Sequence, residues 1–125
     1  MKGGETVRVG GLAVNAHETP GQTPGGTSWT WRSCEGPQCV DFVYADSLTP
    51  VSAEGFLFSR SRDYQNAVAD FEKSFRMIER AACGILLTPH PEASRAWLKD
   101  PDACRKYVAG ARERLRKRIA GETKA

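Results

Sequence analysis

The chain has 125 residues, of which 40% are hydrophobic and 26% charged, as expected for one domain of ordinary size with a buried core. No apolar run approaches the roughly 18 residues of a membrane span, and Met1–Glu5 precedes no apolar signal region, so we expect no membrane partner. The net charge of +3 is concentrated in a basic run without interleaved aromatic residues, which favours the solvated face of a terminal helix over a nucleic-acid patch (Arg112, Arg114, Arg116, Lys117 and Arg118).

Two pairs of strands are predicted in the first part of the chain. Residues 6–17 alternate weakly between apolar and polar and break at Gly10–Gly11, which predicts two short strands joined by a turn. Residues 19–26 are rich in Pro, Gly and Thr and are predicted to form a loop. Residues 27–31 and 40–45 are predicted to pair as a hairpin, because aromatic and β-branched residues favour strands and a Gly-Pro tip lies between them.

The apolar period then changes to that of a helix. After the irregular residues 46–62, apolar residues recur at steps of four and three behind an expected N-cap at Asp63 (Tyr64, Val68, Phe71, Phe75 and Ile78). Residues 84–87 are predicted to form a buried strand. A second helix is predicted after Asp100, with Pro101 first and one buried face (Cys104, Val108, Ala111, Leu115 and Ile119). This order predicts an α/β architecture with helices on a sheet, thin enough to suggest a missing further layer.

The four cysteines admit three interpretations. Cys34 and Cys39 are close in sequence, whereas Cys83 and Cys104 are far apart. A structural zinc site usually needs a close Cys pair on each side, which the first pair fits loosely and the second does not. Two disulfides formed in an oxidising compartment fit better, and reduced buried cysteines in a cytosolic chain remain the alternative.

Three loops at predicted strand ends are candidate sites, because α/β folds tend to place their sites there: residues 19–26, 46–49 and 88–91. His90 lies between two prolines, which restrict the backbone as a rigid metal ligand requires, although such a histidine is more often an ordinary loop residue. Asp46 and Ser47 are equally suited to turn capping. His17 and His90 are the only histidines, and local spacing assembles no complete zinc site.

Three segments, in order and with fitting spacing, resemble the third subclass of zinc-dependent β-lactamases in the metallo-β-lactamase superfamily. Residues 16–31, AHETPGQTPGGTSWTW, resemble its second metal-ligand loop. Residues 44–49, YADSLT, resemble the substrate-side loop, and residues 83–91, CGILLTPHP, resemble the last metal-ligand segment. The resemblance covers almost the whole chain, so we interpret residues 1–125 as a single partial domain, the C-terminal half of such an enzyme.

The resemblance implies an αββα sandwich with zinc held at the edge between its two sheets. In that family His90 would ligate the second zinc. Ser47 and Thr49 would belong to the substrate-binding site, where Ser47 would hydrogen-bond water near that zinc and Thr49 would help to hold the carboxylate of a β-lactam. Cys83 and Cys104 match a family disulfide, and the hairpin with Cys34 and Cys39 resembles a smaller branch of the subclass. The family activity is zinc-assisted hydrolysis of the lactam amide, usually in the periplasm or outside the cell.

Two departures from the family pattern bear on activity. The motif His-x-His-x-Asp-His does not occur, which implies an N-terminal half as a missing partner. Gln22 stands where the family has a histidine, and its neutral oxygen is a weaker zinc ligand than imidazole. We therefore expect this chain alone to bind zinc poorly and to be inactive. We also expect its unpartnered inner sheet face to make it self-associate (Trp29, Trp31, Val43 and Leu86).

Two other interpretations of the chain stay open. The first is a non-catalytic fragment, from a truncated gene or a decayed copy, which the glutamine at position 22 favours. The second is another hydrolase with the same fold, against which Thr49 and the two cysteine pairs argue through the resemblance.

Overall fold

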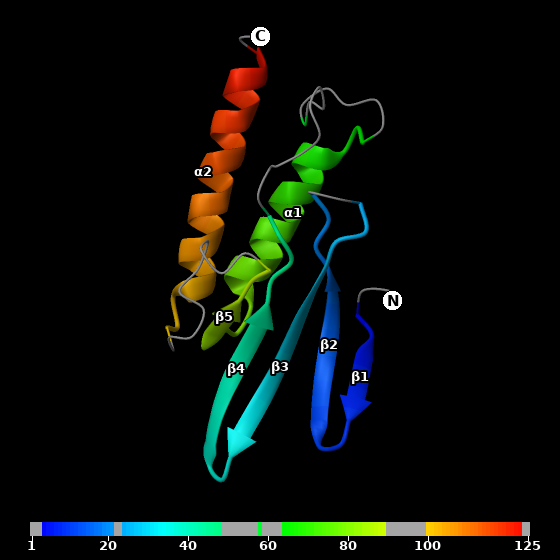
Figure 1. Ribbon diagram of the computed structural model, residues 1–125, viewed down its shortest axis with the longest axis vertical. Helices are drawn as coiled ribbons and strands as arrows, with labels where there is room; N and C mark the ends of the chain where they lie inside the picture. Colours follow the sequence, from blue (N-terminus) through cyan, green and yellow to red (C-terminus); the bar gives the residue numbers. More distant parts are fainter. Residues whose placement is uncertain (1–3, 22–23, 49–57, 59–63, 90–99, 124–125) are drawn as a thin grey trace.

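The computed structural model describes residues 4–21, 24–48, 58, 64–89 and 100–123, and these form one sheet with two helices (Figure 1). The elements in chain order are β1 (Thr6–Val9), β2 (Leu12–Glu18), β3 (Thr27–Glu35), β4 (Gln38–Tyr44), α1 (Ala67–Arg80), β5 (Ile85–Leu87) and α2 (Ala103–Thr123). The strands lie side by side in chain order; β4 and β5 are parallel and the other neighbours antiparallel. The predicted mixed α/β architecture is confirmed. Neither helix is long and apolar enough to cross a membrane.

The two hairpins end in two-residue turns that begin with glycine. Gly10 and Gly36 each have a φ of 58°, a conformation that glycine adopts without a steric penalty. Pro37 follows Gly36, and glycine at the first of two turn residues is typical of the type II′ turn, whose twist matches paired strands. The β3–β4 turn therefore consists of Gly36 and Pro37 alone, and both strands are longer than predicted.

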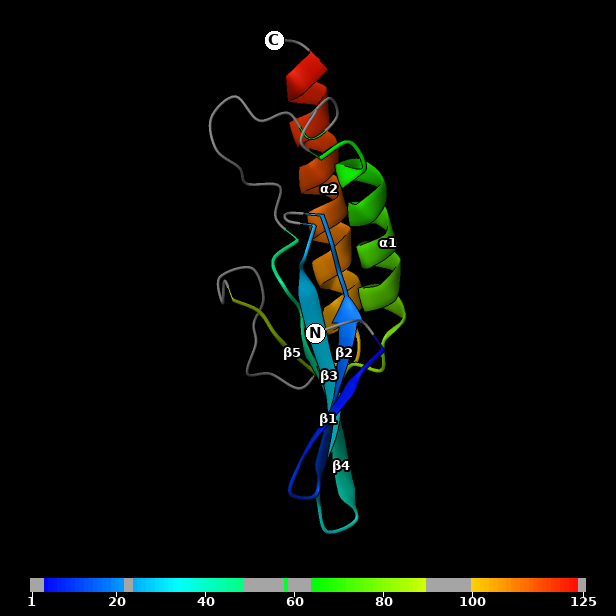
Figure 2. The same ribbon diagram turned by 90° about the vertical axis from the view of Figure 1, so that its right-hand side faces the viewer.

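Both helices cover the same face of the sheet, as the side view shows (Figure 2). The register places Asn15, Thr30, Val43 and Leu86 in one row across β2, β3, β4 and β5. Val43 and Leu86 of this row are almost fully buried under the helices. They pack in one core cluster with residues from α1 and α2 (Phe71, Phe75, Ile78, Cys104, Tyr107, Val108, Ala111 and Leu115).

The N-terminus of α1 differs from the prediction in two ways. The helix begins at Ala67 behind Asn66, which makes no side-chain cap, so the expectation of a cap at Asp63 is wrong. The hydroxyl of Tyr64, outside the helix, instead donates to the Asp70 carboxylate at 2.6 Å. Val68 is 36% exposed, because the buried face continues from Phe71 back to Ala67 and not to Val68.

The start of α2 lies close to the prediction. Asp100 performs the capping, since its Oδ1 accepts the backbone N–H of Asp102 at 2.8 Å. Pro101 lies in the turn before Ala103, where the helix begins, and the shift of two residues is of the size by which helix ends commonly differ.

The basic side chains of α2 form ion pairs. Arg112 bridges the helices: its guanidinium binds Glu72 at 2.8 Å and Glu79 at 3.3 Å and lies over the Phe75 ring. Other basic residues pair with carboxylates near them in sequence (Arg105–Asp102, Lys106–Asp100, Arg116–Glu113 and Arg118–Glu122). Much of the positive charge of this segment is therefore balanced locally, and Arg112 also ties α2 to α1.

The sheet face opposite the helices is apolar and carries an open groove of about 380 Å³, lined by Leu12, Val14, Trp29, Trp31 and Tyr44. The rings of Trp31 and Phe42 stack beside it, with centroids 5.3 Å apart. The expectation that grouped Val43 and Leu86 with the tryptophans is wrong, because the register assigns those two residues to the helix-covered face. We call the groove residues together with Phe42 the open apolar face.

We expect the isolated chain to self-associate through the open apolar face, because contiguous apolar patches larger than a few hundred Å² are rare on soluble monomers. The double variant Trp29→Thr/Trp31→Thr should shift the chain toward monomer in sedimentation velocity runs and reduce binding of a hydrophobic dye. Arg32→Thr, on the other face of β3, is the matched control and should leave association unchanged. A clean monomeric parent that binds no dye would contradict this prediction.

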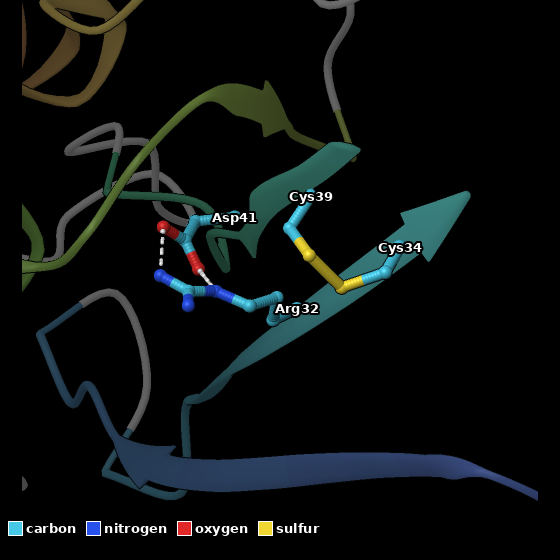
Figure 3. The surroundings of a disulfide bond; sticks show 4 residues. All are labelled: Arg32, Cys34, Cys39 and Asp41. Atoms are coloured by element: carbon cyan, nitrogen blue, oxygen red, sulfur yellow. Dashed lines mark hydrogen bonds and ion pairs between the residues drawn. A yellow bond between two sulfur atoms is a disulfide. The ribbon is translucent and has the colours of Figure 1, made fainter. Parts of the chain in front are cut away.

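Both cysteine pairs form disulfides in the structure: Cys34 with Cys39 and Cys83 with Cys104. The first joins directly opposite residues of the β3–β4 hairpin, near the exposed ion pair of Arg32 and Asp41 (Figure 3). The second joins the residue before Gly84 to the buried first turn of α2, with Cα atoms 6.2 Å apart. It therefore fixes α2 to the end of the sheet where β5 begins.

Removal of the Cys83–Cys104 disulfide should destabilise the chain more than removal of the other. In the chain-entropy model, a bridge across a separation of 21 residues contributes roughly 3 kcal/mol, and one across 5 residues roughly 2 kcal/mol. The variant Cys83→Ala/Cys104→Ala should accordingly lose more free energy of unfolding in urea than Cys34→Ala/Cys39→Ala. The reverse order, or free thiols at residues 83 and 104 in the oxidised folded parent, would count against it.

Candidate functional site

The strand pairings bring the ends of the strands that precede the three predicted site segments to one edge of the sheet. Glu18 at the end of β2 pairs with Thr27 at the start of β3, and Trp29 pairs with Tyr44 at the end of β4. Because β5 is parallel to β4 and Leu87 pairs with Tyr44, β5 ends at the same edge. The segments that follow β2, β4 and β5 therefore all leave the sheet here, and we call this the site edge.

The structure describes some of the predicted site residues and not others. Ser47 lies at the site edge and is 5% exposed. Gln22, Thr49 and His90 lie outside the described residues, so their roles stay predictions. Within the part of the chain that is described, no three His, Cys, Asp or Glu side chains are grouped to hold a metal ion. The described residues thus do not by themselves form a zinc site.

A buried hydroxyl cluster ties two of these segments together. The Ser28 hydroxyl lies 2.7 Å from the Thr19 hydroxyl and accepts the backbone N–H of Asp46 at 2.9 Å. Ser28 and Thr19 are almost fully buried. A Cβ at Gly26 would lie 2.5 Å from the Thr19 carbonyl oxygen and 2.7 Å from an Asp46 carboxylate oxygen, so glycine is required where these segments cross. We call these four residues the Ser28 junction.

The two ends of the segment from Thr19 to Gly26 are hydrogen-bonded to each other, and its first residues are attached to α1. The N–H of Thr19 donates to the carbonyl of Gly26 at 2.9 Å, which closes the loop at its base. The Ser74 hydroxyl of α1 donates to the Pro20 carbonyl at 2.6 Å. Gly21 has a φ of 152°, and a Cβ there would lie 2.5 Å from the Phe71 ring. Pro20 and Gly21, the last described residues before position 22, are therefore held against α1.

The segment that carries Ser47 is attached on both sides. The Ala45 N–H donates to the Leu87 carbonyl at 2.9 Å. The Leu48 N–H donates to the hydroxyl of Tyr107 in α2 at 3.3 Å, and burial raises the pKa of that hydroxyl. The sequence prediction missed Tyr107, although it stands beside Val108 and three residues after Cys104, on the predicted buried face. It also missed Ser28 and Ser74, whose contacts are with residues distant in sequence.

His17, the other histidine, belongs to a different surface. Its Nε2 lies 2.7 Å from the Thr30 hydroxyl on the helix-facing side of the sheet. It lines an open cavity of about 310 Å³ at the end of α1, together with Met77 and the ion pair of Arg32 and Asp41. Partial burial lowers the pKa of the imidazole below its ordinary value of 6.5.

The lowered pKa of His17 predicts a loss of stability in mild acid. Because the unfolded chain binds the proton more readily, the contribution of neutral His17 is present above pH 6.5 and is lost as the pH falls through the lower, folded-state value. The free energy of unfolding should therefore decline below pH 6.5, and His17→Gln should flatten that decline. An equal decline in parent and variant, measured by urea unfolding at several pH values, would contradict it.

No family model matches the chain, but several solved structures do. Rm3 metallo-β-lactamase is 46% identical with a TM-score of 0.95, and the match covers 98% of this chain and 50% of that one. MEM-A1, a subclass B3 metallo-β-lactamase from a soil metagenome library, is 40% identical with a TM-score of 0.94, covering 98% and 52%. A B3 metallo-β-lactamase described as the first with an active-site glutamic acid is 39% identical with a TM-score of 0.91, covering 98% and 47%. The chain thus spans about half the length of these relatives.

Proposed function

Because this chain is a relative of the subclass B3 metallo-β-lactamases and corresponds to one half of their fold, we propose that it is the C-terminal half of a zinc-dependent β-lactamase. A second half-sandwich completes the enzyme, and the complete protein hydrolyses the amide bond of β-lactam antibiotics. The chain alone is inactive, since a catalytic zinc usually has three protein ligands.

The open apolar face is the observation that carries this proposal. Two tryptophans, a tyrosine and aliphatic residues form a groove on one side of the sheet. The helices lie on the other side (Figure 2). Two sheets that pack face to face lie about 10 Å apart and bury such side chains between them. A second sheet with its own helices would cover this face and give the αββα order of layers.

The site residues of the proposed enzyme come from both halves. From this chain, His90 and Gln22 would serve as zinc ligands, and Ser47 and Thr49 would contact the substrate. In the sequence all four follow strands, β2, β4 and β5, that end at the site edge. The two disulfides suit an oxidising compartment, so we place the protein in the periplasm or outside the cell.

A non-catalytic fragment is the second candidate, and Gln22 is the observation that favours it. An amide oxygen is a poorer zinc ligand than imidazole, so a chain no longer selected for hydrolysis could carry it. Such a chain would keep its core and disulfides and would lack activity with any partner half.

Reconstitution separates the two candidates. The 125-residue chain is mixed or co-expressed with the half of Rm3 metallo-β-lactamase that it does not match, and hydrolysis of a chromogenic cephalosporin is followed with added zinc. Stable assembly with zinc uptake and measurable hydrolysis is expected. A matched control, the same mixture with Trp29→Thr/Trp31→Thr, should assemble less. A stable 1:1 assembly that remains inactive in excess zinc would favour the non-catalytic fragment.

A further inference from the structure

The Ser28 junction joins parts of the chain that are far apart in sequence but flank the proposed site. Thr19, the partner of Ser28 on one side, lies three residues before Gln22 in the sequence. Asp46, its partner on the other side, immediately precedes Ser47. Ser28 stands between them as the second residue of β3, fully buried, with its hydroxyl bonded on both sides. A single oxygen atom therefore links the two segments.

The Ser28 hydroxyl binds one buried partner, the Thr19 hydroxyl, and one part-buried partner, the Asp46 amide. The Thr19 contact is buried and the Asp46 amide contact is part-buried, so a hydrogen bond lost at Thr19 is not readily replaced by one to water. The Thr19 carbonyl oxygen and an Asp46 carboxylate oxygen both lie close to the position that a Cβ of Gly26 would take, so the two segments pack closely together at this glycine. Loss of the hydroxyl would remove the Asp46 N–H bond and so loosen the backbone directly before Ser47, between the anchors at Ala45 and Leu48.

We propose that Ser28 is a positioning residue that sets the place of Ser47 relative to Thr19 and Gly26. This inference rests on the proposed function, in which Ser47 contacts the substrate. Ser28 acts only through Asp46 and does not itself touch the substrate. Its hydroxyl determines how well the assembled protein binds a β-lactam, beyond any contribution to the stability of the fold.

The first experiment uses the 125-residue chain alone and measures amide hydrogen exchange by NMR. In Ser28→Ala, the Asp46 amide should exchange at least about tenfold faster than in the parent, because local opening no longer breaks a hydrogen bond. Thr30→Val is the matched control, since it removes the comparable 2.7 Å hydrogen bond to His17 on the same two strands. The Asp46 amide should keep the parent rate in Thr30→Val, and an unchanged rate in Ser28→Ala overturns the proposal.

The second experiment measures kcat and KM of the reconstituted pair. Misplacement of the Ser47 segment should raise KM for a chromogenic cephalosporin in Ser28→Ala by up to about 100-fold. A loss of folded protein, as in Thr30→Val, lowers apparent kcat and leaves KM unchanged. Thr19→Val should change KM in the same direction as Ser28→Ala, whereas Thr19→Ser, which keeps the hydroxyl, should restore the parent KM.

The outcomes distinguish this inference from the proposed function. If the parent pair assembles but does not hydrolyse, the proposed function fails and the positioning role fails with it. If the parent is active and KM rises no more in Ser28→Ala than in Thr30→Val, only the positioning role is overturned. If Thr19→Ser is as impaired as Thr19→Val, the hydroxyl bond between residues 19 and 28 is not the cause and the proposal also fails.

Discussion

Replacement of Gln22 by histidine is expected to raise both the zinc affinity and the β-lactam turnover of the reconstituted pair. An imidazole nitrogen suits zinc better than the neutral amide oxygen that the chain now has at this position. Loss of a residue that only hydrogen-bonds a metal ligand lowers metal affinity about 10- to 100-fold. Gain of an imidazole that binds the metal directly should therefore raise zinc affinity by at least about tenfold. Elemental analysis across a zinc titration and hydrolysis of a chromogenic cephalosporin measure the two effects.

Three control chains define what that result means. Gln38→His adds an imidazole at the exposed first residue of β4, at the end of the strand away from the site edge, and should change neither zinc content nor turnover. His90→Ala should lower both, since it removes the proposed ligand of the second zinc. The parent chain without its partner half should remain inactive. Equal zinc titrations for the parent and Gln22→His pairs would refute the assignment of residue 22 as a ligand.

Phe71→Ala is expected to cost about 3–5 kcal/mol of stability, the range for truncation of a buried phenylalanine. The Phe71 ring is fully buried between Phe58 and Phe75, with ring centroids 5.4 and 5.8 Å away. It also packs against Gly21, so the cavity would open beneath the segment that leads to Gln22. A loss of this size is a large part of the total stability of an ordinary domain.

The measurement is urea unfolding followed by circular dichroism, with Val68→Ala as the matched control. Val68 lies on the same helix but is 36% exposed, so its truncation should cost well under the amount for Phe71. If Phe71→Ala unfolds the chain outright, Phe71→Leu, which conserves more of the volume, should give a measurable intermediate loss. A loss for Phe71→Ala no larger than for Val68→Ala would contradict the packing described here.

Local patterns in the sequence account for the elements that were predicted correctly. The alternation and turn at Gly10–Gly11, the Gly-Pro tip and the helical spacing from Phe71 to Ile78 all depend on residues close together in the chain. The start of α1 was predicted wrongly because Asp63 is a good cap residue by type, whereas the helix begins behind Asn66 and Tyr64 binds Asp70. The site residues Gln22 and His90 came from the resemblance, since their local sequence is compatible with ordinary loops.

The sequence by itself determined the strands and helices, their order and the family that the chain resembles, because each depends on composition and spacing along the chain. Only the tertiary structure decided which sheet face the helices cover. Alternation along a strand divides its side chains between two faces, but the register between strands decides which faces lie on the same side of the sheet. The register places Val43 and Leu86 on the side opposite Trp29 and Trp31. The Ser28 junction and the Tyr107 contact likewise join residues 9 to 59 positions apart, and no local pattern encodes such a pairing.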